Sequence, residues 1–208
     1  KIAVMINKDP EVKDRLKVVF MENYNVSLAE NIIPAADVGE QISLASKEAS
    51  GTSNMKFMLN GALTMATLDG ANIEIKDACG DENIFIFGLT KDEVYEYYKN
   101  RNYNARDIYE QNPVVHRILN AFIDGTIPNI TNEGPEIFDS LTAFNDEYFL
   151  LRDFNDYVRA QKELETLYKD SRAWSRASLM NIATSGIFSS DRTVGQYAEE
   201  IWFIEPKK

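Results

Sequence analysis

The chain has 208 residues, of which 44% are apolar and 26% charged, and its formal net charge is −11. This composition is close to that of ordinary globular proteins, which excludes a mainly disordered chain. The acidic excess disfavours nucleic acids and anionic membranes, so we expect neither as a partner. The sequence contains no apolar run near the roughly 20 residues that a membrane-spanning helix needs.

Two rare residue types limit the chemistry that we expect. Cys79 is the single cysteine and cannot form an internal disulfide, which favours a reducing compartment, and we expect a cytoplasmic location. It lies in the polar stretch DACGD, which is typical of an exposed loop. The single histidine, His116, excludes the common His-rich zinc motifs, and we expect no metal site. The chain begins with Lys1 rather than Met, so we expect it to be part of a longer protein.

The first hundred residues alternate between two patterns. Short apolar runs predict strands at residues 16–21, 31–33, 61–67 and 83–87, and mixed segments predict helices at 37–45, 54–60 and 91–99. This alternation predicts an α/β fold, a three-layer sandwich around a mostly parallel sheet, with residues 1–100 as its α/β part. Four strands are fewer than the roughly six of a doubly wound domain, which again indicates missing N-terminal sequence.

Residues 112–208 carry mainly helical patterns, and we expect extra C-terminal helices there. Glycines and prolines at residues 124–135 predict a loop. Asp191 precedes the apolar positions of the last helix and is its expected N-cap.

The segment EASGTSNMKFMLNG, residues 48–61, has the features of a binding site. Small polar residues and Gly51 lead into an apolar helix, and backbone N–H groups at such a junction can bind an anion, typically phosphate. Lys56 is expected in the first helical turn, where a cation opposes the helix dipole at a cost of about 0.3–1 kcal/mol. A desolvated lysine loses its proton readily and can condense with an aldehyde to a Schiff base.

An ordinary structural interpretation of this segment stays open on the residues alone. Lysines in apolar helices usually extend to water, and a glycine among hydroxylic residues often belongs to a capped turn. Neither the G-x-x-x-x-G-K-[ST] motif nor the G-x-G-x-x-G motif occurs.

The longer string EASGTSNMKFMLNGALTMATLDGANIEI resembles the pyridoxal-phosphate site of the α-glucan (glycogen, starch and maltodextrin) phosphorylases. That family's pattern is E-A-S-G-T-G-N-M-K, then N-G-A-L-T, then D-G-A-N-x-E. Further segments resemble the same family in the same order, at residues 22–30, 33–37, 40–43, 181–186 and 188–192. The resemblance implies that residues 1–208 are a partial, cofactor-binding C-terminal domain, with a Rossmann-like sheet as in half of a GT-B glycosyltransferase.

The resemblance also implies roles for individual residues. Lys56 would carry pyridoxal 5'-phosphate as a Schiff base. Gly51, Thr52 and Ser53 would lie by the cofactor phosphate, with Thr52 also near the reacting sugar, and Tyr24 and Val26 would line the cofactor pocket. Glu48, Ala49, Ser50 and Gly51 would contact the transferred glucosyl unit, with the Glu48 carboxylate accepting from sugar hydroxyls. Ser53 and Ala66 stand where the family usually has glycine; at a position with positive φ, serine would cost about 1 kcal/mol.

The activity implied for the parent protein is phosphorolysis of α-1,4-glucan by inorganic phosphate, which releases glucose 1-phosphate. The missing N-terminal domain would supply the other wall of the glucan groove, and the full-length enzyme is expected to be a homodimer. The fragment alone is expected to be inactive. A different possibility is that the chain is an isolated, non-catalytic domain that binds the cofactor weakly or only folds.

Overall fold

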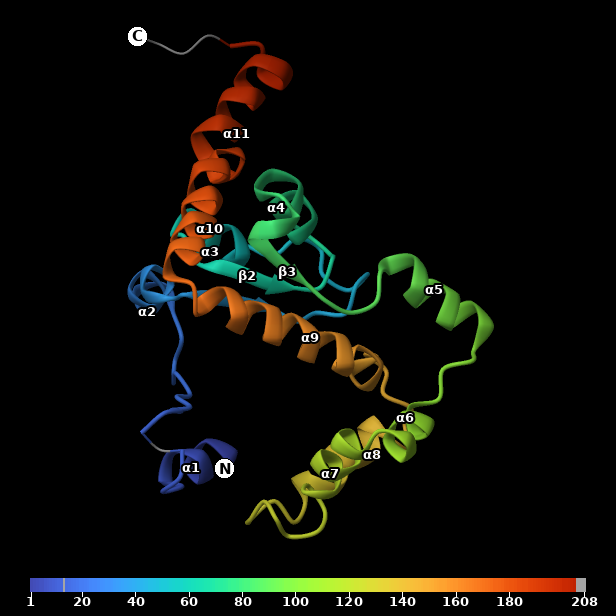
Figure 1. The fold of residues 1–208 in the computed structure, drawn as a ribbon. Coiled ribbons are helices and arrows are strands. Elements are labelled where there is room, and N and C mark those ends of the chain that lie inside the picture. Colours follow the sequence, from blue (N-terminus) through green and yellow to red (C-terminus); the bar gives the residue numbers. More distant parts are fainter. Residues whose placement is uncertain (13, 205–208) are drawn as a thin grey trace. The chain divides into compact units, whose positions relative to one another are not determined.

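The computed structural model describes residues 1–12 and 14–204, and the chain folds as two compact units (Figure 1). Unit 1 contains residues 1–28 and 97–154, and unit 2 contains residues 29–96 and 155–204, within the described part of the chain. Each unit therefore combines residues from before position 100 with residues from after position 112. The two units are described separately below.

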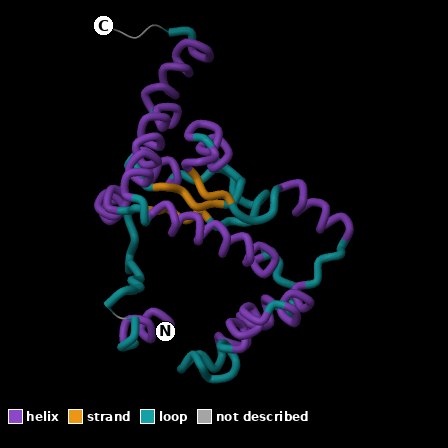
Figure 2. Tube along the Cα trace, in the orientation of Figure 1, coloured by secondary structure: helices purple, strands orange, loops and turns teal. Residues whose placement is uncertain are grey.

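Unit 2 is built around a three-stranded parallel sheet in the order β1-β2-β3 (Figure 2). The strands are β1 (Val38–Gln41), β2 (Leu63–Ala66) and β3 (Ile84–Ile86). Val38 pairs with Leu63 and Thr64 with Ile84. The predicted strands at 61–67 and 83–87 and the mostly parallel sheet are therefore confirmed.

Helices cover both faces of this sheet (Figure 1). Leu63, Met65, Phe85 and Phe87 pack with Ala160 of α9 (Leu150–Tyr168). On the opposite face, Ile84 packs with Met58 of α3 (Ser53–Leu59) and with Ile75 and Cys79 of α4 (Asn72–Cys79). Successive strand residues point to opposite faces, so burial on both faces explains the nearly continuous apolar runs. The α/β prediction is confirmed, with helices on each side of the sheet.

The helix α10 (Ser171–Thr184) crosses the amino ends of β2 and β3. Ser178 Oγ donates to Gly61 O at 2.7 Å, and Asn181 Nδ2 donates to Asn83 O at 2.9 Å. These bonds satisfy carbonyl groups just before each strand, so the opposite, carboxyl edge of the sheet is the one left for a site.

Unit 1 is helical, and its core joins three short helices (Figure 1). Val115 and Leu119 of α7 (Pro113–Asn120) pack with Ala105 of α6 (Ala105–Gln111) and with Phe138 of α8 (Glu133–Leu141). The mainly helical character predicted for residues 112–208 is confirmed for residues 112–204, and residues 205–208 lie outside the described part of the chain. The predicted loop at 124–135 is wrong at its end, because α8 already begins at Glu133 and contains Gly134 and Pro135 in its first turn.

The remaining helical segments have the following bounds: α1 (Ile2–Lys8), α2 (Val26–Ile32), η1 (Ile33–Ala35), η2 (Asp81–Asn83), α5 (Lys91–Asn100), η3 (Ser185–Phe188), α11 (Ser190–Gln196) and the π-helix η4 (Tyr197–Trp202). The helices predicted at 54–60 and 91–99 are thus confirmed as α3 and α5. Among the described helices, none combines the length and apolarity needed to cross a bilayer.

Several local predictions are wrong. Residues 16–21 form no strand: Phe20 is 84% exposed, and the backbone N–H and C=O of Val18 bond the side chain of Asn7 instead of another strand. A strand needs a neighbour for its backbone groups, and the apolar run alone does not supply one. Residues 31–33 lie at the end of α2 and in η1.

The segment 37–45, predicted helical, contains β1 instead. Gly39 explains this outcome, because it is a poor helix former and it lets β1 approach α3 closely. A Cβ on Gly39 would come within 2.7 Å of the Phe57 ring.

Two further predictions are wrong. The N-cap of α11 is Ser189 rather than Asp191, and Cys79 is buried at the end of α4 rather than exposed in a loop.

Candidate functional site

The predicted site residues of unit 2 gather where β1 and β2 end. The loop of residues 48–52 follows β1, and the turn of residues 67–71 follows β2. Parallel strands have their carboxyl ends at one edge of the sheet, and open α/β sheets bind ligands at this edge. We call residues 48–52 the site loop.

The site loop is fastened to the turn after β2 at two points. The backbone N–H of Glu48 donates to Asp69 Oδ2 at 2.8 Å, and Ala71 N donates to Ser50 O at 2.7 Å. Gly70 permits the close approach: its φ is +53°, and a Cβ there would lie 2.5 Å from the Ser50 carbonyl oxygen. The backbone of the loop is therefore held by tertiary contacts.

Two buried asparagines connect the loop to the helices on either side. Asn54 Nδ2 donates to Asn72 Oδ1 at 2.9 Å, and Asn72 Nδ2 donates to Thr67 O at 3.1 Å. Asn54 Oδ1 accepts from the N–H of Met55 at 2.9 Å. The pair joins the start of α3, the start of α4 and the end of β2. The sequence pattern alone does not single out either residue, although an amide side chain at the start of an apolar helix is a signal that points to Asn54.

Lys56 lies at the centre of α3, within its last turn, and its side chain is exposed. At this place a cation does not oppose the helix dipole, so the expected cost of a first-turn lysine does not apply. Within the described part of the chain, Lys56 Nζ forms no hydrogen bond or ion pair. The amine is therefore accessible to a reactant from solution.

The junction of loop and helix presents unused backbone donors. The N–H groups of Gly51, Thr52 and Ser53 donate to no other atom of residues 1–12 and 14–204. Gly51 adopts φ +81°, whereas Ser53 is the first residue of α3 and does not have positive φ. The backbone strain expected for serine at a position with positive φ therefore does not arise at Ser53. Ala66 is fully buried in β2 and also lacks positive φ. Three adjacent donors, followed in the same segment by an accessible lysine, suit a ligand that has both an aldehyde and a phosphate group.

The other predicted residues differ in their surroundings. Glu48 is half-buried, and its Oε2 accepts from Ser43 Oγ at 3.1 Å, whereas Ala49, Ser50 and Thr52 are exposed. Tyr24 and Val26 belong to unit 1, where their side chains are 57% and 75% exposed. The structure thus brings residues 48–56 together, and it describes Tyr24 and Val26 in the other unit.

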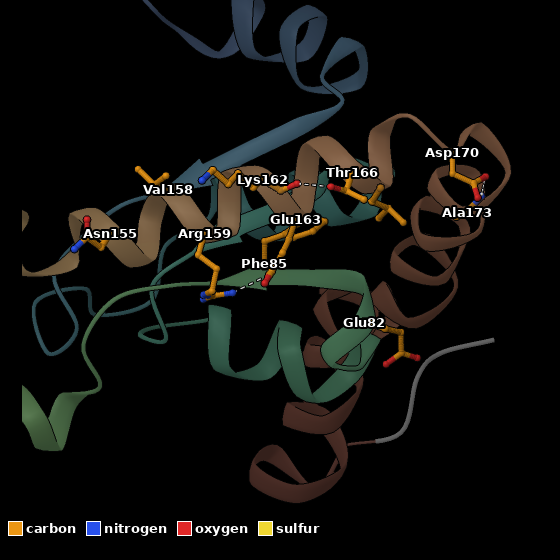
Figure 3. A pocket seen from close by; sticks show the side chains of 11 residues that line it. Glu82, Phe85, Asn155, Val158, Arg159, Lys162, Glu163, Thr166, Asp170 and Ala173 are labelled. Atoms are coloured by element: carbon orange, nitrogen blue, oxygen red, sulfur yellow. Dashed lines mark hydrogen bonds and ion pairs between the residues drawn. The ribbon is translucent and has the colours of Figure 1, made fainter. Parts of the chain in front are cut away.

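A separate groove of about 840 Å³ lies in unit 2 along α9 (Figure 3). Its lining includes Phe85, Arg159 and Lys162 but none of the predicted site residues. The Arg159 guanidinium is occupied by Asp156, by Glu163 and by the Ile86 carbonyl, each at 2.7 Å. The contact with Ile86 covers the open edge of β3, so this arginine has a structural role there.

Comparison with known proteins agrees with the resemblance in the site segment. A family model described as carbohydrate phosphorylase matches residues 1–204. The chain is 52% identical over 205 residues to a glycogen phosphorylase of Bacillus subtilis, and 47% identical over 210 residues to the muscle forms of glycogen phosphorylase from Homo sapiens and Oryctolagus cuniculus. These matches cover 99–100% of the chain but 24–26% of the relatives, so the chain spans about a quarter of their length. On this evidence, the chain belongs to the carbohydrate phosphorylase family.

Proposed function

We propose that the chain is the part of a glucan phosphorylase that holds pyridoxal phosphate on Lys56 and contacts the transferred glucosyl unit. The observation that carries this proposal is the accessible Lys56 amine on α3, which follows the unbonded N–H groups of Gly51, Thr52 and Ser53 by three to five residues. Family membership supports it further, because the relatives are glycogen phosphorylases. The parent reaction would be phosphorolysis of α-1,4-glucan to glucose 1-phosphate.

In this proposal, Lys56 binds the cofactor covalently through Nζ. The N–H groups of Gly51 and Thr52, the Thr52 hydroxyl and Ser53 bind its phosphate. When bound, pyridoxal phosphate supplies a phosphate group that can exchange a proton with the substrate phosphate. Because Lys56 follows these N–H groups in the same short segment, attachment through its Nζ would limit where the cofactor phosphate can lie.

The site loop would orient the sugar. Glu48 accepts hydrogen bonds from sugar hydroxyls, and charge-assisted bonds of this kind are about twice as strong as neutral ones. Ala49, Ser50 and Gly51 form the backbone strip against which the sugar lies. Because the loop is fastened to Asp69 and Ala71, these contacts would need little reorganisation when the sugar binds.

The remaining parts of the proposal concern the larger protein. Because the relatives are about four times as long, we propose that the chain works with an N-terminal part as one half of a GT-B fold, within a cytoplasmic homodimer that acts on glucan and inorganic phosphate. The alternative is a non-catalytic domain that binds the cofactor weakly. The discriminating observation is whether the unmodified chain binds the cofactor at Lys56.

The test uses pyridoxal phosphate and borohydride on the chain itself. Reduction should fix the cofactor to Lys56, and peptide mapping should find the label in the peptide that contains this residue. Lys56→Ala should lose the label with little change in circular dichroism, and Lys47→Ala is the matched control that should retain it. Label on Lys47 or Lys76 would contradict the assignment, and no specific label on a folded chain would favour the non-catalytic alternative.

A further inference from the structure

Asp69 is a buried acidic residue with a direct contact to the site loop. Its side chain is 8% exposed, and Oδ2 accepts the backbone N–H of Glu48 at 2.8 Å. Its own backbone N–H donates to Thr67 O at 3.0 Å, which places Asp69 at the end of β2. A buried carboxylate is costly unless its hydrogen bonds compensate, and a bond from N–H to a charged oxygen is stronger than one to a neutral amide. This contact therefore fixes the backbone of Glu48 firmly.

A second contact restrains the carboxylate of Glu48. Ser43 Oγ donates to Glu48 Oε2 at 3.1 Å, and the Ser43 carbonyl accepts from Thr67 Oγ1 at 2.5 Å. Glu48 is thus held at its backbone by Asp69 and at its carboxylate by Ser43. Both supporting residues are tied to Thr67, directly after β2. The side chain of Glu48 would otherwise move freely about several bonds, so the two contacts restrict where its carboxylate can lie.

We infer that Asp69 is a positioning residue for Glu48: it aims the Glu48 carboxylate at the sugar hydroxyls without touching the sugar itself. Ser43 contributes to the same positioning, because its hydroxyl holds the Glu48 carboxylate. This inference rests on the proposed function, in which Glu48 binds the transferred glucosyl unit. Binding groups must be held within about 0.5 Å of their productive positions, and supporting residues of this kind provide that precision.

The test is a double-mutant cycle in the full-length phosphorylase that contains this chain. Asp69→Ala should lower kcat/KM for the glucan by about 10- to 100-fold, because a misplacement near 1 Å costs about that much. In a Glu48→Ala background the same substitution should have almost no further effect. Asp69→Asn retains an acceptor oxygen and should recover most of the activity, and Asp77→Ala, an exposed acidic residue of α4, is the control that should change nothing.

A second readout follows the hydrogen bond in the chain itself. Amide exchange of Glu48 should be faster in Asp69→Ala than in the unmodified chain, and Asp69→Asn should restore protection. Should Asp69→Ala fail to fold, Asp69→Leu, which has nearly the shape of aspartate but no acceptor oxygen, replaces it in the cycle with Glu48→Ala.

The outcomes separate this inference from the proposed function. Equal loss of kcat/KM in both backgrounds would show that Asp69 acts through general stability, and it would overturn the inference while leaving the role of Glu48 intact. If Glu48→Ala alone leaves kcat/KM unchanged in an active enzyme, the proposed sugar contact fails independently. Loss confined to the background that retains Glu48, together with rescue by Asp69→Asn, supports the positioning role.

Discussion

Asn54 and Asn72 form a hydrogen bond of 2.9 Å in the interior of unit 2, 18 residues apart in sequence. Both side chains are almost completely buried, at 1% and 2% exposure. The bond connects the first turn of α3, the helix of Lys56, with the first turn of α4. Since each amide also bonds the backbone, the pair sets the position of the lysine helix relative to the turn after β2.

Replacing Asn72 should destabilise the chain through this pair. In Asn72→Ala, the Nδ2 group of Asn54 keeps only a 3.4 Å contact with Ser50 O, so a buried donor is left poorly satisfied. We expect a loss of about 1–3 kcal/mol in the free energy of unfolding, measured by urea denaturation. Asn60→Ala is the matched control, because the Asn60 amide bonds Lys56 O on the exposed side of the same helix. Equal losses for the two variants would contradict the special role of the buried pair.

The contiguous part of the site could be predicted from the sequence, and the contacts that fasten it could not. Residues 48–56 form one short string whose residue types indicate an anion site with a lysine. The bond from Glu48 to Asp69 spans 21 residues and leaves no periodic pattern in the sequence. Strands show the same limit: residues 61–67 and 16–21 have similar apolar patterns, yet only the first has a neighbouring strand to pair with.

Gly70 should not tolerate a side chain. Gly70→Ala combines a left-handed backbone at φ +53° with a Cβ 2.5 Å from Ser50 O, so the site loop must shift. We expect a loss of about 2–4 kcal/mol in the free energy of unfolding, from backbone strain and overpacking together. Gly125→Ala serves as the control, because Gly125 also has positive φ, at +89°, but the added Cβ has no described atom within 4 Å, so this substitution should cost about 1 kcal/mol. A Gly70→Ala chain as stable as Gly125→Ala would refute the close packing of loop and turn.

Glu48→Gln should weaken sugar transfer in the full-length enzyme. The substitution keeps the size of the side chain and removes its charge, so the sugar hydroxyls lose a charged acceptor worth about 1.5–4 kcal/mol in a dry site. We expect kcat/KM to fall by about 10- to 1000-fold, while cofactor content, measured by absorbance, stays unchanged. Unaltered turnover would assign the Glu48 carboxylate a purely structural role.

Cys79 should make the stability of the chain fall at alkaline pH. Burial, together with the neighbouring carboxylates of Glu82 and Asp81, raises the pKa of the Cys79 thiol from 9.0 to about 11. Between these values the unfolded chain has lost the thiol proton and the folded chain has kept it, so the contribution is complete below pH 9 and is lost as the pH rises towards 11. We expect about 2–3 kcal/mol in total, at about 1.4 kcal/mol per pH unit.

The measurement compares urea denaturation of the unmodified chain and of Cys79→Ala from pH 8 to pH 11. Other groups titrate equally in both proteins, so their difference isolates the thiol. A difference that stays constant across this range would show that the thiol has no raised pKa.

The chain alone should not catalyse phosphorolysis, even with pyridoxal phosphate added. The reaction needs the cofactor phosphate and the substrate phosphate close together, and at about 4 Å two such anions repel by several kcal/mol in a partly buried site. Residues 40–72, which include the site loop and the turn, contain two cationic residues, Lys47 and Lys56, against Glu40, Glu48 and Asp69. Covalent attachment of the cofactor would remove the charge of Lys56 from the balance. In the proposed function, the missing positive charge would come from the rest of the larger protein, since the chain spans about a quarter of the length of its relatives.

The assay is release of glucose 1-phosphate from maltodextrin and phosphate, by the chain alone and by the chain mixed with the proposed N-terminal part. Turnover by the chain alone at the rate of the mixture would overturn the need for outside cations.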